Sequence, residues 1–185
     1  MTDELTTTIP PGVKLIEDFV NTNELDEADG EKLVDPGALG TWLNDRELLP
    51  AGATVSGDDL MRALRVREAL RALLLVNNGG ELDPSAVPTL NSAADESHLR
   101  VSFSPSGEAM LVPDEPDVPG ALSQILAVAY TAMADESWDR LKACRLDDCQ
   151  WAFYDQSKNR SRTWCSMKVC GNRAKARAYR ERQRG

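Results

Sequence analysis

Apolar residues in the first three quarters of the chain recur mostly with the period of an α-helix. Between residues 13 and 21, Leu15 and Ile16 are each followed four positions later by another apolar residue, which predicts a short helix with one buried face. The same reasoning predicts helices over residues 36–44, 57–78, 84–95 and 120–134. The last of these is rich in alanine and is mostly apolar, as expected of a well-buried helix.

The ends of these segments carry helix start and stop signals. Asp35-Pro36 and Asp83-Pro84 each place a capping side chain before a proline at the first helical position, and Gly79-Gly80 ends the longest helix. The period then changes, because apolar and polar residues alternate from 99 to 103 and, after a turn at 105–107, apolar residues return at 109–112. This pattern predicts a β-hairpin.

These elements define the expected fold class and domain organisation. We predict a mainly α protein with a small β-hairpin, in which a helical N-terminal domain over residues 1–139 precedes a small C-terminal four-cysteine domain over 140–185. Residues 138–142 are expected to form the strand or linker between them. A chain of 185 residues has room for one ordinary domain and one small one.

Composition excludes several classes of protein. No apolar run approaches the length that spans a bilayer, so no membrane partner is expected. The start at Met1 is polar and acidic, without the basic and apolar regions of a secretion signal, so we expect a soluble cytoplasmic protein.

The net charge of −9 conceals two opposite halves. Residues 1–139 carry eight basic and 26 acidic side chains, whereas residues 140–185 carry 13 basic and four acidic ones. The strongly basic tail is therefore the part expected to meet a polyanion.

All four cysteines lie in this basic tail, with four residues inside each pair and 15 between the pairs: Cys144, Cys149, Cys165 and Cys170. Two short-spaced pairs can place four thiolates around one structural Zn²⁺, about 2.3 Å from each sulfur. Four protein ligands leave no position for a catalytic water, so the metal is expected to hold shape. An iron–sulfur site, redox-switched disulfides and free cysteines are the alternatives, and oxidation with zinc release would make the site a redox sensor.

The tail resembles the CGNR zinc finger, which is named for the tetrapeptide found here at Cys170-Gly171-Asn172-Arg173. Upstream, the segments DFVNT (18–22), DPGALGTWL (35–43) and LRVREALRALL (64–74) resemble the ABATE domain that usually precedes that finger. The resemblance implies a stress-induced transcription regulator whose finger binds DNA.

DNA is the first partner expected of the basic tail. Lysine and arginine displace counterions from phosphates, and a basic helix after Cys170, capped by Asn172, has a suitable width for the major groove. The predicted nucleic-acid contacts are Arg160, Arg162, Lys168, Arg173, Lys175, Arg177, Arg180 and Arg182. The alternative is a zinc-stabilised module that docks on an acidic protein surface, including the acidic domain of a second subunit in a homo-oligomer.

The upstream domain shows no catalytic motif. It lacks a nucleophile elbow, a phosphate loop and a zinc-protease helix, and its single histidine, His98, has no evident partner, so we predict that the protein is not an enzyme. A second hypothesis gives this domain a small-molecule ligand, held by Asn21 and Thr22 with Arg67. The alternative is that Asn21 and Thr22 only cap and turn the chain.

Overall fold

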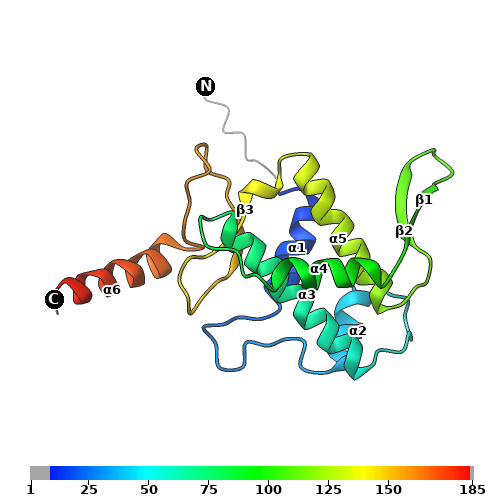
Figure 1. Ribbon diagram of the computed structural model, residues 1–185, viewed down its shortest axis with the longest axis horizontal. Coiled ribbons are helices and arrows are strands. Elements are labelled where there is room, and N and C mark those ends of the chain that lie inside the picture. The colour runs from blue at the N-terminus through cyan, green and yellow to red at the C-terminus, as the bar shows by residue number, and fades with distance from the viewer. Residues whose placement is uncertain (1–8, 184–185) are drawn as a thin grey trace.

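The computed structural model of the protein describes residues 9–183, and helices dominate it (Figure 1). Five helices form the body of the molecule: α1 (Pro11–Val20), α2 (Pro36–Asn44), α3 (Gly57–Val76), α4 (Ala86–Asp95) and α5 (Val118–Ala134). A sixth, α6 (Asn172–Arg182), lies outside this body. The predicted mainly α fold is confirmed. Within residues 9–183 no helix is both long and apolar enough to cross a membrane.

Side-chain caps set several helix starts. Asp35 accepts a hydrogen bond from the Ala38 amide at 2.8 Å, as the Asp-Pro signal predicts. At α3 the cap is Ser56, whose hydroxyl accepts from the Asp59 amide while the Asp59 carboxylate accepts from the Ser56 amide. This reciprocal capping box stabilises the start of the longest helix.

Two predicted helix boundaries are wrong for local reasons. Helix α4 begins at Ala86 because the Asp83 carboxylate accepts hydrogen bonds from the Ser85 amide and hydroxyl, which forms a turn ahead of the helix. Helix α5 begins at Val118, two residues earlier than expected, because Asp117 caps it through the Gly120 amide.

One hydrophobic core joins the helices of the body. Its fully buried members come from α1, α2, α3 and α5 and include Ile16, Phe19, Leu39, Leu43, Leu70, Leu74, Leu122 and Ile125. The core also takes in Leu141, Ala143, Ala152 and Tyr154, which lie beyond the boundary predicted at residue 139. Burial of apolar surface therefore links the finger to the helical domain.

Residues 9–183 contain two small antiparallel hairpins. The predicted one is confirmed as β1 (Leu99–Phe103) with β2 (Ala109–Pro113), and Val101 faces Leu111 across it. The second joins β3 (Leu141–Ala143) to β4 (Ala152–Tyr154), and a short 3₁₀ turn (Trp138–Arg140) connects α5 to β3. Residues 138–142 therefore enter the finger directly, without a flexible linker.

Polar side chains of the helical domain hold the finger by its main chain. The Asn21 carboxamide accepts from the Ala152 amide at 2.8 Å and donates to the Ala152 carbonyl at 2.9 Å. The side-chain carboxamides of Asn77 and Asn78 each donate to two further carbonyls. Those of Asn77 are Trp138 and Leu141, and those of Asn78 are Ala143 and Thr163. The finger is thus fixed in position against α1 and α3.

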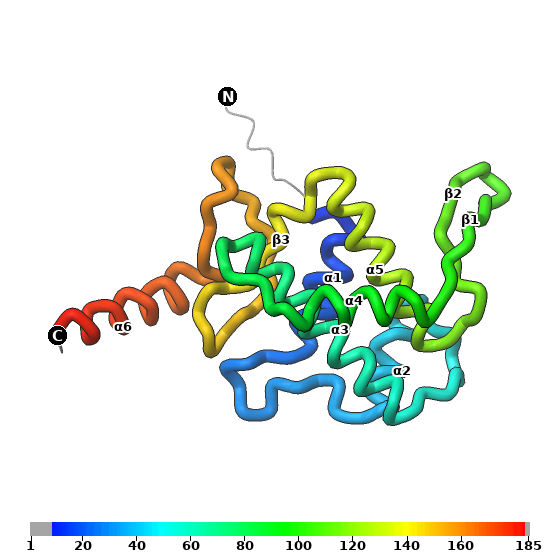
Figure 2. The backbone as a smooth tube through the Cα atoms, in the orientation of Figure 1, coloured from blue at the N-terminus to red at the C-terminus, as the bar shows by residue number. Residues whose placement is uncertain are grey.

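The two most protruding parts of the molecule lie at opposite ends of its long axis. Figures 1 and 2 show the β1–β2 hairpin extending from one end and α6 from the other. The zinc-finger region lies between α6 and the helical body.

We expect Asn21→Ala to lower the free energy of unfolding by about 3 kcal/mol, because it leaves a buried amide and a buried carbonyl of Ala152 without partners. Urea denaturation of the zinc-loaded protein measures this change. Asn91→Ala, at an exposed position on α4, is the matched control and should stay within about 0.5 kcal/mol of wild type. An Asn21→Ala protein as stable as wild type would contradict the assignment.

Candidate metal centre and basic helix

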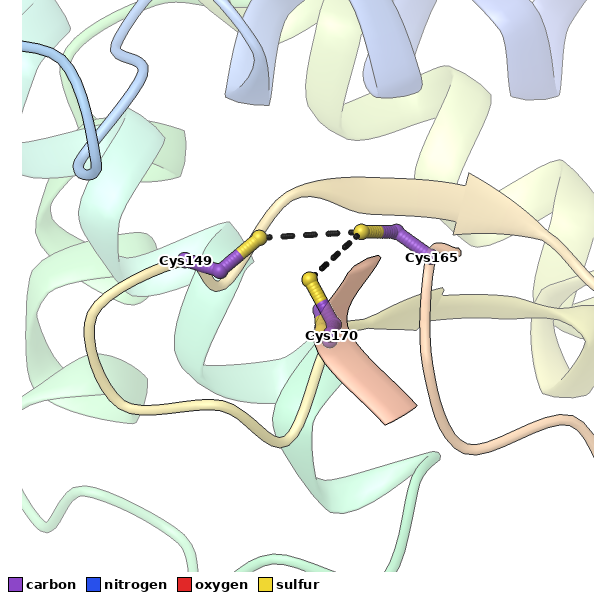
Figure 3. Close-up of side chains that lie close together, drawn as sticks. Cys149, Cys165 and Cys170 are labelled. Atoms are coloured by element: carbon purple, nitrogen blue, oxygen red, sulfur yellow. Dashed lines mark hydrogen bonds between the residues drawn. The ribbon is translucent and has the colours of Figure 1, made fainter. Parts of the chain in front are cut away.

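The four cysteines converge although they come from three separate parts of the finger. Cys144 follows β3 and Cys149 precedes β4. Cys165 lies two residues before a π-helical turn (Met167–Gly171), and Cys170 lies within that turn. Their four sulfur atoms all lie within 4.8 Å of one another. Cys165 Sγ is 3.6 Å from Cys149 Sγ and 3.5 Å from Cys170 Sγ (Figure 3).

These distances suit a zinc ion and do not suit disulfides. A tetrahedron with arms of about 2.3 Å has edges of about 3.8 Å, close to the observed separations. A disulfide needs its sulfurs about 2.05 Å apart, and all four cysteines are free. Sulfur ligands in a closed set of four are typical of a structural zinc site, at which the metal holds the fold together.

Crowding of the sulfurs also favours a bound cation. Hydrogen bonds from Cys149 and Cys165 lower the pKa of the Cys144 thiol to about 2. The same contact with Cys144 raises the pKa of the Cys149 thiol to about 12 and also raises the pKa of Cys165. A thiolate at Cys144 thus opposes ionisation of Cys149 and Cys165, a divalent cation offsets this repulsion, and zinc binding is expected to release protons.

A buried ion pair shapes the loop between the two cysteine pairs. Lys142 Nζ lies 2.8 Å from Asp155 Oδ2 and also donates to the carbonyls of Arg160 and Arg162. Burial opposes ionisation of Asp155, but hydrogen bonds from Lys142, Ser157 and the Arg162 amide lower its pKa to about 2. Lys142 is thus a structural residue.

The metal centre leads directly into α6. Ser166, rather than Asn172, caps the π-helical turn by accepting from the Val169 amide. The Asn172 side chain instead donates to the Lys168 carbonyl, so the prediction that it caps α6 is wrong. At Gly171 a Cβ atom would lie 2.5 Å from the Met167 sulfur, so a larger residue where the turn becomes α6 would displace the Met167 side chain.

Helix α6 buries none of its residues and points away from the body (Figure 1). Its contacts with the rest of the chain are confined to its first half. Arg173 lies 2.7 Å from Asp148 and 3.4 Å from Asp26, and Arg177 lies 3.6 Å from Asp147. The second half of the helix is exposed to solvent.

The eight residues predicted to contact nucleic acid fall into three groups according to their contacts with the rest of the protein. Arg162 is exposed but lies against the finger, where its guanidinium stacks on Phe153 at 4.7 Å and donates to the carbonyls of Trp164 and Cys165. Arg173 forms ion pairs with Asp148 and Asp26, and Arg177 forms one with Asp147. The other five are also exposed: Arg160, Lys168, Lys175, Arg180 and Arg182. Among them only Arg160 forms an ion pair within residues 9–183, at 3.8 Å from Asp139.

Comparison with known protein families agrees with this geometry. The family model of the CGNR zinc finger matches residues 140–183, and that of ABATE, described as "Putative stress-induced transcription regulator", matches residues 14–136. The chain belongs to the ABATE family. It carries a CGNR zinc finger at its C-terminal end, and the predicted structural zinc is confirmed by this match together with the cysteine cluster. No curated protein matches the chain.

The residues predicted to hold a ligand in the ABATE domain form hydrogen bonds with protein groups of that domain and of the finger. Arg67 is 2% exposed and donates to both carboxylate oxygens of Glu31, to Glu68 and to the Thr22 hydroxyl. Thr22 in turn donates to the Phe19 carbonyl. Together with the bonds of Asn21 to Ala152, these contacts give the three residues a structural role.

Sequence reasoning missed the most buried cation of the ABATE domain, Arg71. Its guanidinium donates to Glu68 and to three carbonyls, those of Val20, Asn23 and Gln150. Gln150 lies next to Cys149, so Arg71 connects α3 to the metal centre. The one sequence signal was an arginine on the same helical face as Arg67, four residues away.

We expect one zinc per chain, and we expect its removal to affect the ABATE domain and the finger differently. Chelation should abolish protection from hydrogen exchange in residues 165–182, because this segment lies outside the shared core and the metal holds it in place. Helix α3 should stay protected because its core is independent of the metal. Metal analysis and exchange mass spectrometry test this, and full protection of residues 165–182 after chelation would contradict a structural zinc.

Proposed function

We propose that this protein is a transcription regulator that binds DNA through α6, held in place by the zinc centre. The observation that carries the proposal is the exposure of a basic helix that has no buried residue. An 11-residue helix is marginal in water by itself, and the zinc-held turn supplies the start that it needs.

The distribution of charge on α6 supports insertion into a groove. At about 100° per residue, Arg173, Arg177 and Arg180 share one side of the helix, whereas Lys175 and Arg182 lie on the opposite side. A helix in the major groove has a phosphate backbone on each flank, so cations on both sides reach both strands. The exposed Lys168 and Arg160 extend the basic surface beyond α6.

The family description supports a regulatory role, and the acidic helical domain supplies a means of control. Asp26 of that domain and Asp148 of the finger share Arg173 at the base of α6. DNA phosphates must compete with these carboxylates for the same guanidinium. The proposal involves no catalytic step, and the reducing cytoplasm, where thiolates stay available to zinc, is the expected site of action.

Docking on an acidic protein is a second candidate function, and one observation favours it. Met167 and Val169 flank Lys168 on the π-helical turn and are 52% and 53% exposed. Exposed apolar residues beside a basic helix are typical of a protein interface as well as of a DNA-binding surface.

We expect binding to random double-stranded DNA to depend steeply on salt, with log K against log [salt] falling with a slope near −5 for about six phosphate contacts. Lys175→Ala with Arg182→Ala should weaken binding and make the slope less steep by about 2. Fluorescence anisotropy across a salt series measures both. Arg100→Ala, on the distant β1–β2 hairpin, is the control and should change neither value. A flat salt response would favour the protein-docking function.

Asp148→Asn should strengthen DNA binding about two- to fivefold at low salt, because it frees Arg173 and Arg177 and removes a charge that repels phosphate. The gain should shrink as salt rises. Asp114→Asn, which removes an exposed carboxylate paired with Arg100 beside the β1–β2 hairpin, is the matched control. An unchanged or lower affinity of Asp148→Asn would show that these carboxylates do not compete with DNA.

A further inference from the structure

A hollow of about 410 Å³ lies at the root of the β1–β2 hairpin, where α4 leads into β1 beside α5 (Figure 1). Its lining combines apolar side chains, among them Leu99 and Leu126, with four side chains that are able to form hydrogen bonds: Ser97, His98, Ser123 and Tyr130. This volume falls within the usual range for small-molecule sites, about 300–1,000 Å³. The hollow is separate from the residues Asn21, Thr22 and Arg67 that the sequence suggested.

Ser123 provides an independent sign that something is bound here. It is 4% exposed, and its hydroxyl has no hydrogen-bond partner within residues 9–183. A serine or threonine within a helix usually donates to the carbonyl four residues earlier. Thr41, Thr89 and Thr131 do so in this protein, but Ser123 does not.

The other buried polar atoms without a partner have a simpler explanation. Within residues 9–183 they are Glu17 Oε2 and Arg62 Nε. Glu17 is paired with Lys14 through its other oxygen, and Arg62 forms ion pairs with Asp59 and Glu96. Ser123 has no such compensation, since its single polar group is the unpaired one. Ser123 is one of the residues that line the hollow.

The lining also defines the chemical class of the ligand. It contains no aspartate, glutamate, lysine or arginine, so an ion entering the hollow would lose water without gaining a partner of opposite charge. The surrounding domain is strongly acidic, which further disfavours anions. The apolar side chains match a hydrocarbon body, and the hydroxyl and imidazole groups match a single hydroxyl or carbonyl group.

We propose that this hollow is a binding site for a neutral, mainly apolar small molecule that carries one hydrogen-bonding group, which pairs with Ser123. The site lies on α5, the helix that precedes the finger in the chain. The proposal does not depend on DNA binding.

Titration of the zinc-loaded, ¹⁵N-labelled full chain with 2-naphthol tests the site. Saturable chemical-shift changes are expected in residues 97–99 and 123–130. Ser123→Ala should weaken binding at least fivefold without loss of stability, because the hydroxyl that it removes has no partner to lose. Ala94→Leu, at an exposed position in the lining, should weaken binding by filling the hollow.

Two controls make the test specific. Thr131→Ala removes a hydroxyl of α5 that already donates to the Ala127 carbonyl, so it should leave the affinity unchanged. The anion 2-naphthoate should bind at least tenfold more weakly than 2-naphthol. The absence of saturable shifts, equal affinity in Ser123→Ala, an equal loss in Thr131→Ala, or tighter binding of 2-naphthoate would each overturn the proposal.

Discussion

Convergence of four sulfurs on one ion is the constraint on which the C-terminal finger of the protein depends. The sulfurs come from the ends of two strands and from a π-helical turn, and their separations allow a single tetrahedral ion. The turn that carries Cys170 continues into α6, so the metal fixes where that helix starts and in which direction it points. An exposed helix of 11 residues would otherwise have little to hold it in one orientation.

A cluster of buried cations on α3 reaches the metal centre through Arg71, which donates to the Gln150 carbonyl. Arg67 and Arg71 are almost fully buried on α3, and each shares the carboxylate of Glu68. Burial opposes ionisation of Glu68, yet the two arginines lower its pKa, so the cluster remains charged. Removing one member would leave an unpaired charge in the interior, which is far more costly than losing a surface ion pair. The cluster therefore makes the orientation of the finger specific.

Local signals in the sequence were sufficient for much of this architecture. The helices, the first hairpin and the four ligands follow from short-range patterns such as Asp35-Pro36, the alternation after Leu99 and the spacing of the cysteines. Predicted helix starts and caps were wrong where a side chain forms a different local hydrogen bond. Asp83 accepts from the Ser85 amide, and Asn172 donates to the Lys168 carbonyl.

The roles of Asn21, Arg67 and Arg71 were beyond local reasoning, because their partners lie elsewhere in the chain. The pattern around Asn21 indicates a helix end, but not that its amide pairs with a strand 131 residues away. A polar residue at such a position suggests a ligand or a cap equally well. Only the three-dimensional path of the chain distinguishes a bound molecule from a bound backbone.

The helical domain holds the finger mainly through peptide groups. Asn21, Arg71, Asn77 and Asn78 bond to main-chain atoms of residues 138–163, and every amino acid offers the same carbonyl. Substitutions in that segment that preserve the course of the backbone therefore leave these bonds in place. Evolution can change the chemical character of the outer surface of the finger, and with it the molecules recognised, while the attachment beneath stays the same.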